Sequence, residues 1–171
     1  MTRLARDGVD PETNEPRWSL TFEAVEATVI GALPARLAAL LGDPDGNRRI
    51  IDRLFPPAYA DAEREREHRK LLSESLLEAR QQMLSDVTAL LAGARRKRSG
   101  ALRLQLVPAG LDLLLRFLND VRLVLATGLG IEKNLQDERV SPSHPDAPRY
   151  ALLEYLGHVE SILVEAAASE S

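Results

Sequence analysis

The side chains best placed for chemistry lie within one apolar segment, residues 111–131. Against a run of leucines and valines it carries five polar residues: Asp112, Arg116, Asn119, Asp120 and Arg122. At about 100° per residue on a helix, Asp112, Arg116 and Asn119 share one side. The four-residue spacing lets Asp112 pair with Arg116 and Arg116 with Asp120, whereas Arg122 needs a carboxylate or carbonyl from another element. We expect a stripe of salt bridges that fixes neighbouring helices; the alternative is a polar pocket for a small anion, with Arg122 as the forked donor.

A second candidate is the densest run of positive charge, Arg95, Arg96, Lys97 and Arg98, which Gly93 and Ser99-Gly100 frame. We expect an exposed, solvated loop, because isolated charge runs usually take that form. The functional alternative is contact with phosphate or with an acidic partner protein. No aromatic side chains interleave with the run, and no recognition helix follows it.

A third candidate is the segment Arg53–Asp61, RLFPPAYAD, in which two prolines separate Phe55 from Tyr59. We expect a rigid corner whose aromatic side chains fill part of the core. The alternative is an exposed aromatic anchor for a partner.

The sequence provides no residues for several other kinds of site. It has no cysteine, which rules out thiol redox sensing and thiolate metal sites. Glu65 and His68 have the spacing of half a carboxylate-bridged metal site, but no second Glu-x-x-His motif is present. There is also no serine–histidine–aspartate set and no glycine-rich phosphate loop. We therefore predict no catalytic residues, no cofactor and no metal, and we expect a protein that is not an enzyme.

Composition and periodicity predict the elements that carry these residues. Leucine and alanine dominate the 171 residues and only 4% are aromatic, which favours helices. The predicted fold is mainly α: one domain over residues 1–171, a compact bundle of about five helices with a small β element near the N-terminus. Residues 1–20 form an extension or short strands, and 132–147 form a polar loop. The expected helices are 22–41, with Thr21 as N-cap and a kink or break at Pro34, then 47–55, 61–91, 108–128 and 148–167.

Two further expectations concern packing. The segments RWSL and LRLQLV each resemble a short strand leading into a helix, so they could pair as a small sheet beside the helices. In the central helix, Leu114, Leu118, Val121 and Leu125 should be almost fully buried, because a helix this apolar belongs in a core.

Charge and hydropathy suggest a location and a class of partner. The net charge is −4 and the start of the chain lacks a signal-peptide core, so we expect a cytoplasmic protein without membrane contact. Charged residues interrupt 111–131, the best candidate for a membrane span. An acidic chain is poorly suited to enclosing nucleic acid, so nucleic acid is not the favoured partner.

RLFPPAYAD and LLLRFLNDVRLVLATGLGI, together with Tyr150, Leu153 and Leu156, resemble an actinobacterial family described as a domain of unknown function. Its genes commonly neighbour that of the ClpS adaptor, and Leu118–Leu123 is the most specific part of the match. The resemblance implies an all-helical regulator or accessory protein; some members are oxidative-stress-responsive, AosR-like transcriptional regulators. Redox switching in those members rests on cysteines, so that mechanism does not carry over to this chain.

These observations lead to one preferred function and one alternative. We expect a non-enzymatic regulatory or adaptor protein that acts through protein–protein contacts, with a sigma factor or a Clp-system component as candidate partner. The alternative is a transcriptional regulator that contacts DNA or a sigma factor through Arg95–Arg98.

Overall fold

The computed structural model describes residues 1–131, 141 and 143–169, with every side chain in those ranges except 69–74. Helices hold 61% of the chain and an antiparallel sheet of four strands holds 14%, so the expected mainly-α bundle is wrong and the fold is mixed α/β. The elements run in the order β1 (Arg3–Val9), β2 (Pro16–Phe22), α1 (Ala24–Leu41), α2 (Arg48–Leu54), α3 (Ala62–Ala92), β3 (Arg95–Arg96), β4 (Leu102–Leu106), α4 (Pro108–Gly128) and α5 (Ala147–Ala168).

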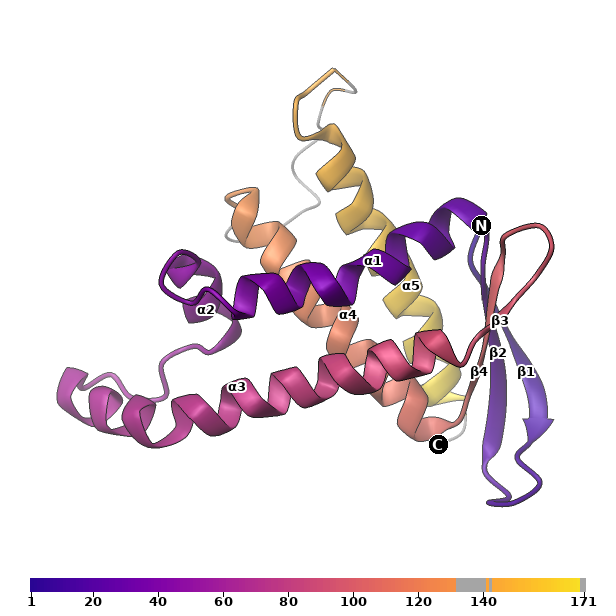
Figure 1. Ribbon diagram of the computed structural model, residues 1–171, viewed down its shortest axis with the longest axis horizontal. Coiled ribbons are helices and arrows are strands. Elements are labelled where there is room, and N and C mark those ends of the chain that lie inside the picture. The colour runs from indigo at the N-terminus through magenta and orange to yellow at the C-terminus, as the bar shows by residue number, and fades with distance from the viewer. Residues whose placement is uncertain (132–140, 142, 170–171) are drawn as a thin grey trace.

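The sheet joins strands from both halves of the chain in the order β1-β2-β4-β3. The suggested pairing of RWSL with LRLQLV is confirmed, with Leu20 opposite Leu104. Alternation along the two central strands gives a fully buried face made of Trp18, Leu20, Phe22, Leu102, Leu104 and Leu106. The helices cover this face only (Figure 1). The residues that alternate with it on the two central strands are polar and include Ser19, Arg103 and Gln105. The sequence did not predict a four-stranded sheet because each short strand supplies only half of the buried face. That face forms only when β2 and β4 lie side by side.

The helices pack around α4, which contacts α2, α3 and α5, while α1 lies beside α3 and the sheet (Figure 1). Leu114, Leu118 and Val121 of α4 are buried as expected, together with Phe117. Leu125 is only half-buried, because it faces a groove described below.

Local signals in the sequence set most helix ends. Asp61 caps α3 by accepting hydrogen bonds from the backbone N–H groups of Glu63 and Arg64. The cap of α1 is Glu23 and not the expected Thr21, because Glu23 and Glu26 form a reciprocal capping box. The helix also continues through Pro34 instead of breaking there.

The polar loop predicted for 132–147 lies mostly outside the described residues. Among the described helices, α1 is long and apolar enough to cross a membrane by length and composition, with a mean hydropathy of 1.6, and 33% of that stretch is buried here. Residues 111–131, which the sequence indicated as the best candidate for a membrane span, lie mostly in α4 (Pro108–Gly128).

Candidate functional site

The polar residues of α4 do not form one stripe. The pair Asp112–Arg116 forms as predicted, with 2.6 Å between the carboxylate and the guanidinium, and both side chains are exposed. The predicted pair Arg116–Asp120 is wrong, because Asp120 is buried and pairs with Arg80 of α3 instead. Asn119 is exposed.

The Arg80–Asp120 pair joins α3 to α4. Arg80 Nε lies 2.5 Å from Asp120 Oδ2, and Nη2 donates a hydrogen bond to Oδ1 at 3.3 Å. The Arg80 guanidinium also lies over the Phe55 ring, 5.3 Å from its centroid. Burial raises the pKa of Asp120 above its usual value, although the Arg80 charge opposes the shift.

Arg122 finds the carboxylate it was expected to need on α5. Its guanidinium pairs with Glu160, and both side chains are largely covered. Gly157, one turn before Glu160, leaves room for the Arg122 guanidinium against α5: a Cβ built there would lie 3.5 Å from Nη2. Burial raises the pKa of Glu160, against the opposing effect of Arg122.

These two pairs tie α4 to helices on either side of it. Asp120 points to α3 and Arg122 points to α5, so the charges satisfy each other between helices and do not converge on one pocket. The two pairs therefore bridge neighbouring helices, although no single stripe of salt bridges runs along α4.

The basic run forms a hairpin. Arg95 and Arg96 make up β3, paired with Arg103 and Leu102 of β4, and Lys97 begins the turn that returns the chain. All four basic side chains are exposed, as expected.

The two aromatic residues of the corner Arg53–Asp61 lie in different environments. Phe55 is half-buried against the core, as expected, whereas Tyr59 is 46% exposed and makes an edge contact with His68. The carboxylate of Glu65 accepts hydrogen bonds from the backbone N–H groups of Ala58 and Tyr59, which fixes the corner to the start of α3.

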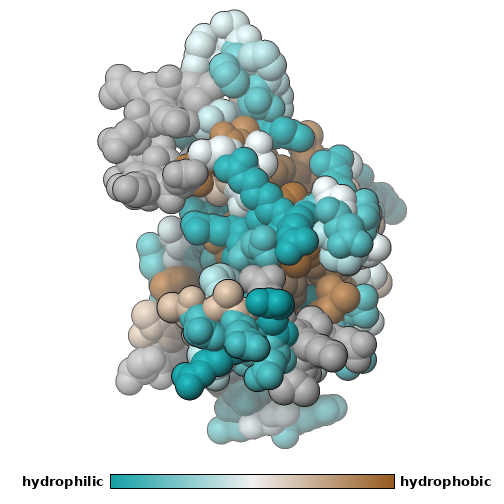
Figure 2. All heavy atoms as spheres, turned by 90° about the vertical axis from the view of Figure 1, so that its left-hand side faces the viewer, coloured by the Kyte–Doolittle hydropathy of each residue, from teal (hydrophilic) through white to brown (hydrophobic). Residues whose placement is uncertain are grey.

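A groove of about 650 Å³ lies between α1, α4 and α5. Val121, Val124, Leu125 and Gly128 of α4 line it at positions i, i+3, i+4 and i+7. On α5 the same spacing runs from Pro148 to Tyr155, and α1 contributes an apolar row from Val25 to Leu40. Figure 2 shows hydrophobic side chains between hydrophilic ones on the side of the molecule where α2 lies. Three helical stripes therefore face one partly open space.

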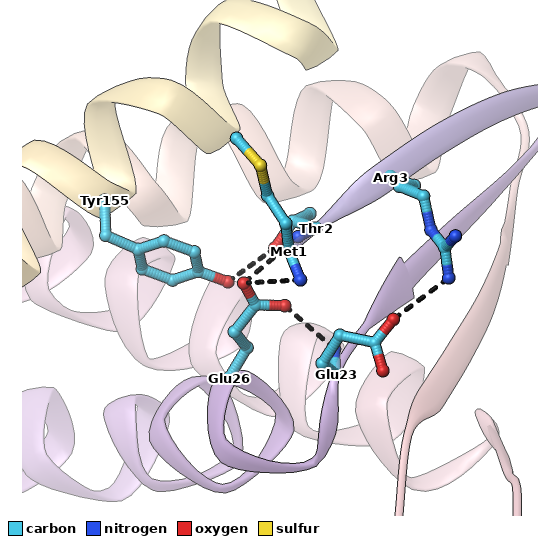
Figure 3. A network of polar contacts seen from close by, with 6 residues as sticks. All are labelled: Met1, Thr2, Arg3, Glu23, Glu26 and Tyr155. Carbon is cyan, nitrogen blue, oxygen red and sulfur yellow. Dashed lines mark hydrogen bonds and ion pairs between the residues drawn. The ribbon is translucent and has the colours of Figure 1, made fainter. Parts of the chain in front are cut away.

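A polar network lies where the start of the chain meets α1 and α5 (Figure 3), and two of its members, Glu26 and Tyr155, also line the groove. Glu26 Oε1 accepts a hydrogen bond from the backbone of Thr2 at 3.1 Å, and the Thr2 hydroxyl lies 2.7 Å from that of Tyr155. Burial raises the pKa of Tyr155 to about 12. Burial also opposes ionisation of Glu26, but hydrogen bonds from Glu23 and Thr2 outweigh it and lower the pKa of Glu26. The network fastens β1 to α1 and α5.

The groove can bind apolar side chains, but its lining brings no nucleophile together with a base. Within the described ranges, no group of three or more histidine, aspartate or glutamate side chains could hold a metal ion.

Sequence reasoning missed this groove, although α1 contains a signal for it. Glu26 and Arg36 are the charged residues among the eighteen of α1, and a helix so apolar is expected to be covered all round. Val25 is nevertheless 78% exposed. Excess apolar surface on α1 is thus the feature that could have indicated a binding face.

No curated protein and no solved structure matches the chain. The family model described as "Domain of unknown function (DUF2017)" matches residues 5–167, nearly the whole chain and every element that lines the groove. The chain therefore belongs to this family of domains of unknown function, DUF2017.

Proposed function

We propose that the protein is a non-enzymatic regulatory or adaptor module that binds an amphipathic helix of a partner protein in the groove between α1, α4 and α5. The observation that carries this proposal is the convergence of three apolar helical stripes on a space that the described residues leave open. A partner helix with apolar residues at the same spacing would complete the packing, as in helix-in-groove recognition.

The rim of the groove indicates the charge of such a helix. Arg36 is exposed on the α1 side and has no carboxylate partner among the described residues. Arg149 is exposed on the α5 side, with Asp146 3.3 Å away. Glu26 is already engaged by backbone N–H groups. Acidic residues beside the apolar stripe of the partner would therefore complement the rim.

The sequence resemblance supplies the first candidates for the partner. A sigma factor and a Clp-system component follow from the actinobacterial, AosR-like relationship, which is part of this proposal, as is a cytoplasmic location. The chain has no cysteine, so its regulation would depend on binding and not on thiol oxidation.

A photo-crosslinking amino acid at Val25 would identify the partner in the source cell, and the same residue at Val164 serves as the matched control. Both are exposed valines on helices, but Val164 does not line the groove. A peptide of the captured helix is then titrated against wild-type protein, Val25→Glu and Val164→Glu. We expect Val25→Glu to weaken binding by at least about tenfold, since it places a carboxylate among apolar contacts, while Val164→Glu binds normally.

The proposal fails if the peptide binds Val25→Glu as tightly as the wild type, or if both crosslinker positions capture the same partner equally. Purified sigma factor and Clp components can be tested against the same two variants.

A second candidate function is contact with DNA through the hairpin Arg95–Arg98. Its exposure at the edge of the molecule favours this alternative. Such a small cluster supports weak, sequence-independent binding that salt abolishes.

A further inference from the structure

A second surface, at the edge of the sheet, carries concentrated positive charge although the whole chain has a net charge of −4. We call it the basic edge: the hairpin cations Arg95–Arg98, together with Arg103 and the outer edge of β4. In the described part of the chain, no carboxylate pairs with any of the four hairpin cations. Arg103 is held by Asp7, at 3.1 Å, and by the hydroxyl of Ser19. Four exposed charges are thus available to a ligand.

The same edge has an unfinished strand arrangement. β4 pairs with β2 along its whole length, but β3 pairs only with Leu102 and Arg103. The chain enters β3 at Arg95, directly after the end of α3, so no part of β3 lies beside Leu104–Leu106. Among the described elements, these three residues therefore have a strand neighbour on one side and none on the other. An antiparallel edge of this kind can accept an added strand.

A hollow of about 410 Å³ lies beside this open edge. Ala89 and Leu90 at the end of α3 form an apolar wall, and Arg95 and Arg103 supply charge at the side. The hollow can therefore receive a small apolar side chain, while acidic neighbours on the ligand meet the arginines.

We propose that the basic edge binds an extended acidic segment of a partner protein, which adds as a short strand beside β4 in line with β3. The proposal concerns a site separate from the groove and does not depend on it. An extended polypeptide can pair its backbone with the free edge of Leu104–Leu106 and direct carboxylates to Arg95 and Arg103.

Nucleic acid fits the same surface less well. A phosphate backbone cannot continue the sheet's hydrogen bonds, and Asp7 places a carboxylate next to Arg103. Trp18 and Phe22, the aromatic residues of the central strands, face the helices and are buried, so they cannot stack on a base.

Titrations of labelled peptides test the proposal. The probes are a peptide of about ten residues alternating glutamate and valine, one alternating glutamate and proline, and a short DNA duplex. The proline peptide has the same charge but lacks half of the N–H groups that strand addition needs. We expect the glutamate–valine peptide to bind at least about tenfold more tightly than the proline peptide, from one or two lost backbone hydrogen bonds.

Two charge-reversed proteins provide matched variants. Arg95→Glu, Lys97→Glu and Arg98→Glu together should weaken binding of the glutamate–valine peptide by more than about tenfold. Arg48→Glu, Arg49→Glu and Arg53→Glu change the net charge equally on exposed positions of α2, away from the sheet (Figure 1), and should leave binding nearly unchanged. Circular dichroism confirms that both variants fold.

Hydrogen–deuterium exchange gives a direct readout of strand addition: the bound peptide should slow exchange of amides in Leu104–Leu106. Equal affinity for the two peptides, unchanged exchange in β4, or equal loss in both charge-reversed variants would overturn the proposal. Tighter binding of the DNA duplex than of the glutamate–valine peptide would also overturn it and favour a nucleic-acid surface.

Discussion

The buried ion pair between Arg80 and Asp120 can be broken by replacing either residue, and the two replacements should lower the free energy of unfolding by very different amounts. Asp120 is 4% exposed at its side chain, whereas Arg80 is 30% exposed. Arg80→Met keeps most of the aliphatic side chain but removes the guanidinium from Phe55 and leaves a buried carboxylate without its cation, so we expect a loss of about 3–5 kcal/mol in the free energy of unfolding at neutral pH. Asp120→Ala leaves an arginine that can turn toward water, so its expected cost is about 1–2 kcal/mol.

Asp120→Asn should cost least, within about 1 kcal/mol of wild type, because the neutral amide avoids the cost of burying a charge and keeps one acceptor for Arg80. Urea denaturation followed by circular dichroism measures all three variants. Arg116→Met provides the control, because the Arg116–Asp112 pair is exposed on both sides and should change stability by less than about 0.5 kcal/mol. Equal costs for Arg80→Met and Asp120→Ala would refute the reasoning from burial.

The pH dependence of the same variants has a definite sign. Burial raises the pKa of Asp120 in the folded protein above its model value of 3.8, so the folded state holds this proton more tightly than the unfolded chain. The stability that the folded protein gains from this tighter proton binding is complete below pH 3.8 and is lost as the pH rises through the raised pKa of the folded state. Wild type should therefore gain stability relative to Asp120→Asn as the pH falls toward 3.8. In Arg80→Met the gain should begin at higher pH, because the cation that opposes the shift is gone.

Other predictions test the core, the helix contacts, the polar network and the hairpin. Leu118→Ala should cost about 2–5 kcal/mol in urea denaturation, because it leaves a cavity in a fully packed site. Gly157→Ala should be neutral or raise stability by up to about 1 kcal/mol, since its Cβ would make an ordinary contact with Arg122, whereas Gly157→Leu should lower the melting temperature by displacing that guanidinium. Ultraviolet titration should show Tyr155 ionising near pH 12, later than a solvent-exposed tyrosine, until unfolding exposes it. A binding titration at physiological salt should detect no sequence-specific DNA complex; a nanomolar complex that survives added salt and needs the hairpin cations would contradict this.

The sequence by itself determined what depends on neighbours along the chain. Pro108 marks the start of α4, the glycines after Thr127 mark its end, and Asp61 caps the start of α3. These signals can be identified in the sequence because caps and helix breakers act within one turn. The pair Asp112–Arg116 also followed from spacing, since residues four apart meet on any helix.

Only the tertiary structure decided which distant partners those elements meet. Asp120 could have paired with Arg116 on its own helix, yet its carboxylate is directed into the core, where Arg80 arrives from α3. Glu160 reaches Arg122 from a helix 38 residues further along the chain. Likewise, β2 and β4 form one core face only because the fold brings residues 16–22 beside 102–106.

The groove and the basic edge also arise from arrangement and not from any single segment. An apolar stripe in the sequence shows that a helix face is covered, but it does not show whether this protein or a partner covers it. The stripes of α1, α4 and α5 leave a shared space because α1 packs on α3 and the sheet. The edge of β4 stays open because β3 begins only after α3 ends and is too short to reach Leu104–Leu106, a relation between elements that local periodicity does not contain.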